Sequence, residues 1–230
     1  MPTELVSEPA GARAWRAVEA QHAVSTQRLI PADSPDPTGQ QDLLERIPEE
    51  AKPPMPAATE GLHYLLATPF RYPPAPWGSR FRAWPDPGIL YAAIERRTAC
   101  AEVGYWRWRF VQDSDGLRDL PATPQTLFQI GAKGASIHLC QPPLSTRAAE
   151  WTSANDYTAT QQLGREAREA GVALIFYTSV RDPEHGTCLA VVDPKALKPR
   201  RPVSQQTWYL TITPTTVIWQ RERERFVFVF

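Results

Sequence analysis

The chain has 230 residues, 42% of them hydrophobic, which is enough to form one substantial domain with a buried core. The 25 Lys and Arg residues balance the 25 Asp and Glu residues, so the formal net charge is zero. A neutral chain argues against a protein that coats nucleic acid or a membrane surface through bulk charge. The 24 prolines against 12 glycines predict stiff, extended connections.

Cysteine and histidine usage bears on the compartment and on metal binding. Cys100, Cys140 and Cys188 lie far apart without CxxC spacing, which argues against a disulfide framework or a structural zinc site and favours a reducing cytoplasm. The four histidines show no spacing typical of metal ligands, so no metal is expected. No secretion signal is visible, and no apolar run approaches the roughly 18 residues that a membrane span needs.

Residues 1–58 are predicted to form a Pro-rich, partly helical N-terminal extension. Short helices are expected at 12–20 and 40–47, with a proline-containing loop at 31–37 between them and a stiff spacer at 52–56. Residues 1–60 hold five basic and ten acidic residues. Such pieces bury little surface alone, so we expect them to pack onto the rest of the chain.

The remaining chain mixes helices and strands. Helices are predicted at 60–66, at 98–110 and at 159–170, with Thr59, Thr98 and Gly171 as their caps. Strands are predicted at 89–94, 126–140 (broken by Gly131 and Gly134), 172–177, 188–192, 208–213 and 217–219. Residues 69–87, rich in prolines and aromatics, predict little regular structure, and 221–230 predict a last strand or an aggregation-prone tail. The absence of regular βαβ repetition favours an α+β fold over a doubly wound α/β fold.

Arginines concentrate in the middle of the chain. Residues 61–110 contain seven arginines, no lysine and three acidic residues. Arg71 and Arg80 stand in rigid, proline-flanked stretches, where their planar forks of donors match phosphate or carboxylate. The alternative is that these arginines are solvated or stack on neighbouring aromatic rings.

Three further side chains have both a structural and a functional interpretation. Tyr91 is either a core tyrosine of its strand or a ring that stacks on a flat heterocycle. Glu102, among small apolar residues, either interacts with the helix dipole or is buried and paired with an arginine. Ser179, just past a predicted strand, is either a turn serine or a ligand-binding residue.

Two common catalytic motifs are absent. The stretch Gly131-Ala132-Lys133-Gly134 lacks the glycine spacing and the Lys-Ser/Thr ending of a P-loop. No G-x-S-x-G sequence is present, which argues against a serine hydrolase built on a nucleophile elbow. The arginine-rich middle of the chain therefore holds the densest candidate chemistry.

Five short motifs follow one another in the order and spacing of a known family, with 11 residues from Arg80 to Tyr91 and 11 from Tyr91 to Glu102. The motifs are Phe70-Arg71-Tyr72, Gly78-Ser79-Arg80-Phe81, Leu90-Tyr91-Ala92, Ala99-Cys100-Ala101-Glu102-Val103 and Tyr177-Thr178-Ser179-Val180-Arg181. In this set the chain resembles the RES domain family, which takes its name from an arginine, a glutamate and a serine. The resemblance covers residues 59–213 and leaves 1–58 as the extension and 214–230 as a C-terminal strand or tail.

This resemblance implies a fold similar to that of ADP-ribosyltransferases, in which small mixed or antiparallel sheets and surrounding helices flank an NAD cleft. It implies a toxin of a bacterial toxin–antitoxin pair that cleaves the nicotinamide glycosidic bond of NAD by hydrolysis or phosphorolysis. The alternatives are an ADP-ribosyltransferase that modifies a protein, and a non-catalytic module that binds NAD or a partner. The implied partner is an Xre-type helix-turn-helix antitoxin, with a homodimer as a further possibility, and with no metal, direct nucleic-acid binding or membrane involved.

The resemblance also implies roles for individual residues. Arg71 and Arg80 match the two family arginines and suit the pyrophosphate of NAD. Tyr91 suits stacking on nicotinamide or its ribose, and Ser179 a hydrogen bond to the ribose or the amide. Glu102 suits stabilisation of the positive charge that builds on the ribose. Glu102, Arg71 and Tyr91 are thus the expected catalytic residues. The sequence departs from the commoner family motif at the second arginine, where it carries the additional Arg82, and it leaves open whether this changes the substrate or acceptor preference.

Overall fold

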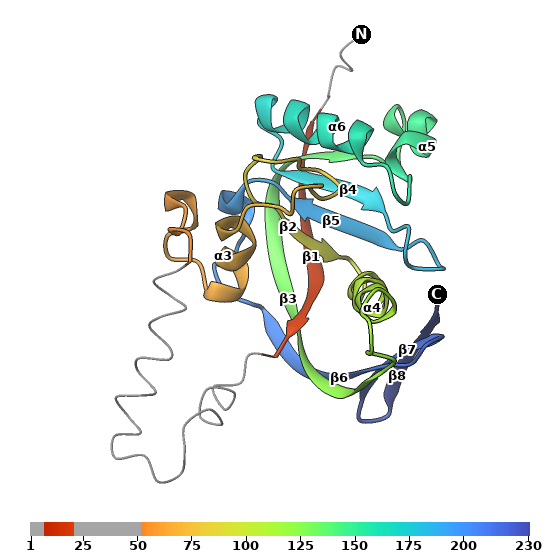
Figure 1. The fold of residues 1–230 in the computed structure, drawn as a ribbon. Helices are drawn as coiled ribbons and strands as arrows, with labels where there is room; N and C mark the ends of the chain where they lie inside the picture. Colours follow the sequence, from red (N-terminus) through yellow and green to blue (C-terminus); the bar gives the residue numbers. More distant parts are fainter. Residues whose placement is uncertain (1–6, 21–51) are drawn as a thin grey trace, which may run out of the picture.

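The computed structural model describes residues 7–20 and 52–230, which form one mixed sheet with helices around it (Figure 1). The strands are β1 (Glu8–Glu19), β2 (Leu90–Ala93), β3 (Leu120–His138), β4 (Leu174–Thr178), β5 (Thr187–Val191), β6 (Ser204–Ile212), β7 (Thr216–Arg221) and β8 (Glu224–Val229). The α-helices are α3 (Tyr64–Arg71), α4 (Arg96–Gln112), α5 (Ala148–Trp151) and α6 (Thr158–Glu169). Single 3₁₀ turns are η1 (Ala57–Thr59), η2 (Leu144–Arg147) and η3 (Pro194–Ala196). The expected α+β class is confirmed.

The sheet closes partly on itself because β3 is long and has neighbours on both edges. Its order is β1-β2-β5-β4-β3-β6-β7-β8, and β1 also pairs with β3 in register from Glu8 opposite Ser136 to Glu19 opposite Gln125. The other edge of β3 pairs with β6 and, near its C-terminus, with β4, in the single parallel pairing among the described strands. The strands β1, β2, β5, β4 and β3 therefore form a ring within one continuous mixed sheet.

Helix α4 lies in the hollow of this curved sheet. It contacts β1, β2 and β5 on one side and β6, β7 and β8 on the other (Figure 1). Four consecutive residues at its N-terminal end, Thr98, Ala99, Cys100 and Ala101, are all buried. Small side chains on every face allow strands to approach this end of the helix from several directions. Glu102 follows directly, so the helix carries a carboxylate into the interior.

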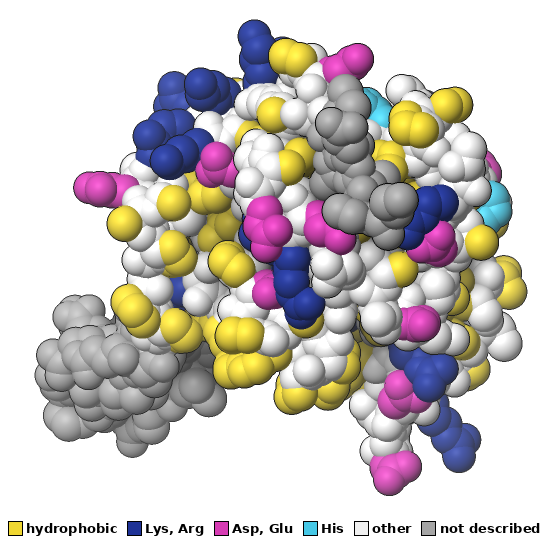
Figure 2. All heavy atoms as spheres, turned by 90° about the horizontal axis from the view of Figure 1, so that it is seen from above, with side chains coloured by type: hydrophobic (Ala, Val, Ile, Leu, Met, Phe, Trp, Pro, Cys, Tyr) yellow, Lys and Arg dark blue, Asp and Glu magenta, His cyan; other side chains and the backbone are white. Residues whose placement is uncertain are grey.

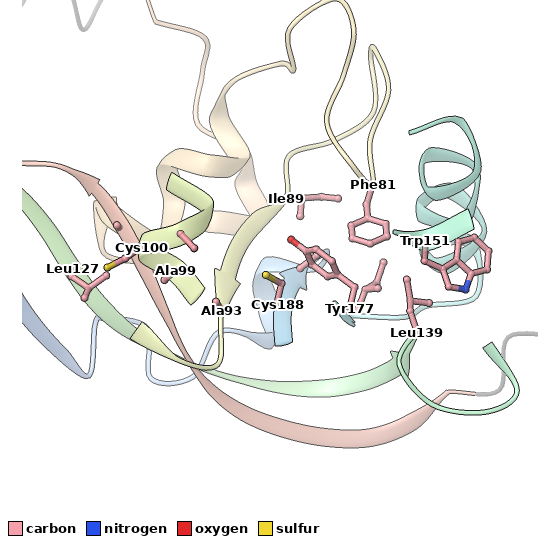
Figure 3. Close-up of a cluster of buried hydrophobic side chains, with 14 of the residues drawn as sticks. Phe81, Ile89, Ala93, Ala99, Cys100, Leu127, Leu139, Trp151, Tyr177 and Cys188 are labelled. Carbon is pink, nitrogen blue, oxygen red and sulfur yellow. The ribbon is translucent and has the colours of Figure 1, made fainter. Parts of the chain in front are cut away.

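Two buried clusters lie on the two sides of the sheet. The larger cluster lies on the side of α4 and α6, and it includes Trp208, Trp219 and Tyr177. Figure 3 shows part of this cluster, in which the rings of Phe81 and Tyr177 meet edge to face with centroids 4.9 Å apart. The smaller cluster lies on the side of α3 and includes Phe128. Both faces of the central strands are therefore covered.

On the face in Figure 2, Lys and Arg side chains lie among Asp and Glu side chains over much of the surface. This mixture agrees with the formal net charge of zero. None of the helices within 7–20 and 52–230 is both long and apolar enough to cross a membrane.

Residues 12–20 form a strand where a helix was predicted. Glu8–Glu19 form β1, which pairs with β3 over twelve residues. Alanine favours a helix locally, but pairing with a strand more than 100 residues away overrides this weak preference. The loop at 31–37 and the helix at 40–47 lie outside the described residues.

Other elements differ mainly at their ends. The helix expected at 60–66 runs instead from Tyr64 to Arg71, and the side chain of His63 caps it by accepting from the Leu65 amide. The helix expected from Thr98 begins at Arg96, so Thr98 lies inside it. Strand β3 runs through Gly131 and Gly134 without a break. The other predicted elements are confirmed within a few residues: β2, α6, β4, β5, the β6–β7 hairpin and the final strand β8.

Gly164 lets α6 pack directly against the backbone of the segment that carries Arg80. A Cβ atom at this position would lie 2.1 Å from the carbonyl oxygen of Phe81, so one of the two segments would have to move. We expect Gly164→Ala to lower the free energy of unfolding by about 1–3 kcal/mol, as overpacking substitutions do. Denaturant unfolding measures this change.

Gly11→Ala is the matched control, because its Cβ would meet its nearest atom at an ordinary 3.6 Å. Its stability should equal or exceed that of the unchanged chain, since alanine loses less backbone entropy than glycine on folding. Equal stability of both variants would show that α6 has room to shift away from this segment.

Candidate active site

A cavity of about 360 Å³ lies between the N-terminal part of α4 and the strands β1 and β2. Strand β1 contributes residues 15–17, the irregular segment before β2 contributes 77–80, and α4 contributes Glu102 and its neighbours. Tyr157 and Arg181 come from the loops after α5 and β4. The walls thus combine aromatic rings, three arginines and a single carboxylate among the described residues.

The carboxylate of Glu102 is the acidic group of this cavity. Its Oε1 accepts a hydrogen bond from the Ser179 hydroxyl at 2.5 Å, and the Cys188 thiol lies 3.8 Å from the same oxygen. Burial raises the pKa of Glu102 above that of an ordinary glutamate, while the hydrogen bond from Ser179 and the charges of Arg80 and Arg181 partly oppose this rise. Glu102 is therefore a carboxylate with increased basicity.

The Ser179 hydroxyl has its orientation fixed by the turn after β4. Its oxygen accepts hydrogen bonds from the backbone amides of Arg181 (3.2 Å) and Asp182 (2.9 Å), so its one proton points to Glu102. Ser179 is fully buried and is not among the residues that line the cavity. The structure thus places Ser179 behind Glu102 as a residue that positions the carboxylate.

A buried network holds this turn against α4. The Asp182 carboxylate is buried and accepts a hydrogen bond from the Thr98 hydroxyl at 2.8 Å. Arg97 lies 3.7 Å from Asp182 and forms a 2.9 Å ion pair with Glu184. The hydroxyl of Thr98, expected to cap the helix, is used here instead. The network ties the loop that carries Ser179 to the helix that carries Glu102.

Arg80 reaches the cavity as the sequence analysis expected. Its Nη1 donates to the carbonyl oxygens of Trp151 (3.0 Å) and Ser153 (3.1 Å), and its guanidinium lies 4.8 Å from the centre of the Tyr157 ring. These contacts hold the cation close enough to Glu102 to act on its pKa. Arg80 is therefore a fixed positive charge in the cavity wall.

Tyr91 also lines the cavity, and it organises the segment that carries Arg80. Its hydroxyl accepts a hydrogen bond from the Phe81 amide and shares one with the Ser79 hydroxyl, both at 3.0 Å. Burial raises the pKa of Tyr91, so the hydroxyl is protonated at neutral pH. Tyr91 thus combines a structural contact with a ring that faces the cavity.

The structure adds two arginines that the sequence analysis did not assign. Arg16 on β1 lines the cavity, donates to the Tyr91 carbonyl oxygen at 2.6 Å, and has its pKa lowered by burial to about 10. Arg181 lines it from the other side, donates to the Ala154 carbonyl oxygen at 2.6 Å, and lies 3.9 Å from the centre of the Tyr105 ring. The Nε atoms of both arginines are buried without a hydrogen-bond partner.

The sequence points to Arg181 and to Arg16 to different degrees. Arg181 stands two residues after Ser179 and lies within one of the five motifs. Arg16 could have been found only by interpreting 12–20 as a strand. In a strand, side chains alternate between the two faces of the sheet, and this alternation would have assigned Arg16 to one face.

Two of the arginines singled out in the sequence lie elsewhere. Arg71, at the end of α3, donates from Nε to the Pro53 carbonyl oxygen and does not line the cavity. Arg82 donates to the Tyr72 carbonyl oxygen and does not line it either. The structure therefore brings Arg80, Tyr91 and Glu102 together, with Ser179 behind them, but does not bring Arg71 to them.

The side chains of the site suit an organic anion with a flat ring. Guanidinium groups bind phosphate oxygens, aromatic rings pack against a heterocycle, and a carboxylate stabilises positive charge. Among the described residues, no three His, Cys, Asp or Glu side chains cluster as metal ligands would. The arrangement can therefore bind a phosphate-containing substrate and stabilise a cation that develops beside Glu102.

The family model of the RES domain matches residues 55–213, from the segment before η1 to the end of β6. No curated protein matches the sequence. One solved structure that resembles the chain is that of the M. tuberculosis MbcT–MbcA toxin–antitoxin complex, at 13% sequence identity and a TM-score of 0.47, covering 90% of this chain and 87% of that one.

The burial of Glu102 makes a prediction about stability and pH. Because the pKa of the folded state is raised, the folded protein binds more protons than the unfolded chain above the ordinary pKa of about 4.5. The free energy of unfolding of the wild type should therefore fall relative to that of Glu102→Gln as the pH rises through this value and beyond. Denaturant titrations of both proteins between pH 4 and pH 8 measure the difference.

A difference that stays constant across this range would show that Glu102 has the same pKa in the folded and unfolded states. Glu150→Gln is the control for removing an exposed carboxylate. Its pKa is lowered by Arg147, so its stability difference from the wild type should not change in the same direction.

Proposed function

The chain belongs to the RES family, and we propose that its cavity binds NAD and cleaves the nicotinamide glycosidic bond. The observation that carries this proposal is the Glu102 carboxylate, which Ser179 orients inside an aromatic cavity that also holds Arg16, Arg80 and Arg181. NAD presents to such a cavity a flat cationic ring, a ribose and a pyrophosphate. Each of these has a complementary group among the residues of the cavity wall.

The reaction breaks the bond between the ribose C1′ and the nicotinamide nitrogen. The bonding electron pair leaves with nicotinamide, and positive charge builds on the ribose. The Glu102 carboxylate accepts hydrogen bonds from the ribose hydroxyls and stabilises this charge. Water or phosphate then bonds to C1′. Where water attacks, it loses a proton, and the raised pKa makes the Glu102 carboxylate a better acceptor for it.

The roles of the neighbouring residues follow from their positions. Arg16, Arg80 and Arg181 bind the pyrophosphate through charge-assisted hydrogen bonds. Tyr91 packs against the nicotinamide riboside, and Ser179 positions the carboxylate rather than contacting the substrate. The pyrophosphate role that the sequence resemblance placed on Arg71 thus falls to Arg16.

We further propose that the protein acts in the cytoplasm as the toxin of a toxin–antitoxin pair, with an Xre-type helix-turn-helix antitoxin as its partner. The family supports this assignment, and depletion of NAD would be toxic because many reactions share the dinucleotide. Masking of the cavity mouth by the antitoxin would suppress this activity. Coexpression with the product of an adjacent helix-turn-helix reading frame should restore growth.

Incubation of the purified full-length protein with NAD, with and without inorganic phosphate, tests the activity. The wild type should release nicotinamide, and Glu102→Gln should reduce kcat by roughly 10²–10³-fold, the loss typical when a group that stabilises transition-state charge is removed. The product distinguishes the acceptor: ADP-ribose for water, and its phosphorylated form for phosphate. Intact NAD under both conditions would refute the proposal, and labelling of a lysate protein from NAD would favour the transferase alternative.

Arginine substitutions decide which side chain binds the pyrophosphate. Arg16→Ala should raise KM for NAD by about tenfold or more, because a hydrogen bond to a charged group contributes about 1.5–3 kcal/mol. Arg13→Ala, at an exposed position of the same strand, is the control and should leave KM unchanged. A rise in KM for Arg71→Ala but not for Arg16→Ala would restore the assignment made from the sequence.

A further inference from the structure

We propose that Trp77 and Trp106 form a stacking site for the adenine of NAD at the mouth of the cavity. This inference rests on the proposed function, since it concerns the part of the substrate farthest from the bond that is cleaved. Neither tryptophan is among the residues that the family motifs singled out. The evidence is their exposure, their fixed positions and their neighbours.

Both indoles line the cavity while remaining largely exposed to solvent. Trp77 is 78% exposed and Trp106 is 52% exposed, whereas Trp208 and Trp219 in the core are fully buried. A large aromatic side chain left in water beside a cavity commonly marks a binding surface. Exposure also places these two residues at the opening, whereas Glu102 is only partly exposed.

Neighbouring residues hold the backbone of Trp77 and the ring of Trp106. Gln161 donates from Nε2 to the carbonyl oxygens of Trp77 (3.3 Å) and Ser79 (3.2 Å), which ties the segment to α6. The Trp106 ring projects from α4 and meets the Tyr105 ring edge to face, with centroids 5.3 Å apart. Groups that are already ordered lose less conformational entropy when a ligand binds.

Arginines accompany both indoles in the cavity wall. Trp77 stands three residues before Arg80, and the guanidinium of Arg181 lies 5.4 Å from the centre of the Trp106 ring. Arg80 and Arg181 in turn act on the pKa of Glu102. The cavity wall therefore combines a carboxylate, arginines and indoles, which are complementary to the ribose, the pyrophosphate and the adenine of NAD.

The size of the cavity supports the same arrangement. A volume of about 360 Å³ is near the lower end of the roughly 300–1,000 Å³ of pockets that hold drug-sized ligands. A dinucleotide with its nicotinamide riboside beside Glu102 must extend past the opening. A purine provides the flat apolar face that an exposed indole can stack on.

Kinetics with NAD and with nicotinamide mononucleotide, which lacks the adenosine half, test the inference. Trp77→Ala and Trp106→Ala should each reduce the ratio of kcat/KM for NAD to that for the mononucleotide by about tenfold, within the range measured for base stacking on aromatic side chains. Trp84→Ala is the matched control, because Trp84 is 58% exposed in the same irregular segment but does not line the cavity. It should keep the wild-type ratio.

Equal losses on both substrates would overturn the inference, because they would show that the indoles act on the nicotinamide half or only on the fold. A calorimetric titration with 5′-AMP decides the question independently of turnover. AMP should bind the wild type and Trp84→Ala with equal affinity and the other two variants about tenfold more weakly. If NAD is not cleaved, the proposed function fails while this titration still tests the site; equal AMP affinity of all four proteins, or no binding to any, would overturn the site itself.

Discussion

Burying the carboxylate of Glu102 costs free energy, and the surrounding structure is organised to offset this cost. An ionised carboxylate is stable inside a protein only if hydrogen bonds or opposite charges replace its water. Ser179 supplies the hydrogen bond, and Arg80 and Arg181 supply the charge. These groups compensate only in part, because the pKa of Glu102 remains raised. The residual cost keeps the carboxylate more basic than that of an ordinary glutamate.

The fold makes this arrangement possible by surrounding one helix with strands. Small residues at the start of α4 let β1, β2 and β5 approach it closely, and the turn after β4 brings Ser179 to the same place. Strand β1 has two roles, since it closes the ring of strands and carries Arg16 into the cavity. Strand β1 is therefore part of the same structural domain as the residues that the family model matches, although that model begins at residue 55.

Motifs in the sequence pointed to part of the wall of this cavity, and the parts they did not reach have physical causes. Tyr91, Glu102 and Arg80, which the structure brings together, stand in motifs with a specific spacing. Arg16 was missed because the alanine-rich stretch around it resembles a helix, and its strand identity depends on β3, far along the chain. The local sequence of Arg71 says nothing of the direction of its side chain once α3 has docked, and the structure shows that its Nε donates to the Pro53 carbonyl oxygen. The position of Ser179 also required the structure, since only its hydrogen bonds show that its hydroxyl points to Glu102.

The central claim is that Glu102 lies beside the ribose of a bound NAD molecule. A crystal structure of the Glu102→Gln variant soaked with NAD tests this claim most directly, because the substitution removes the charge that drives cleavage and keeps the shape of the side chain. We predict the nicotinamide ribose within hydrogen-bond distance of residue 102 and the pyrophosphate between the arginines of the cavity. NAD bound elsewhere, or with its ribose turned away from residue 102, would contradict the account.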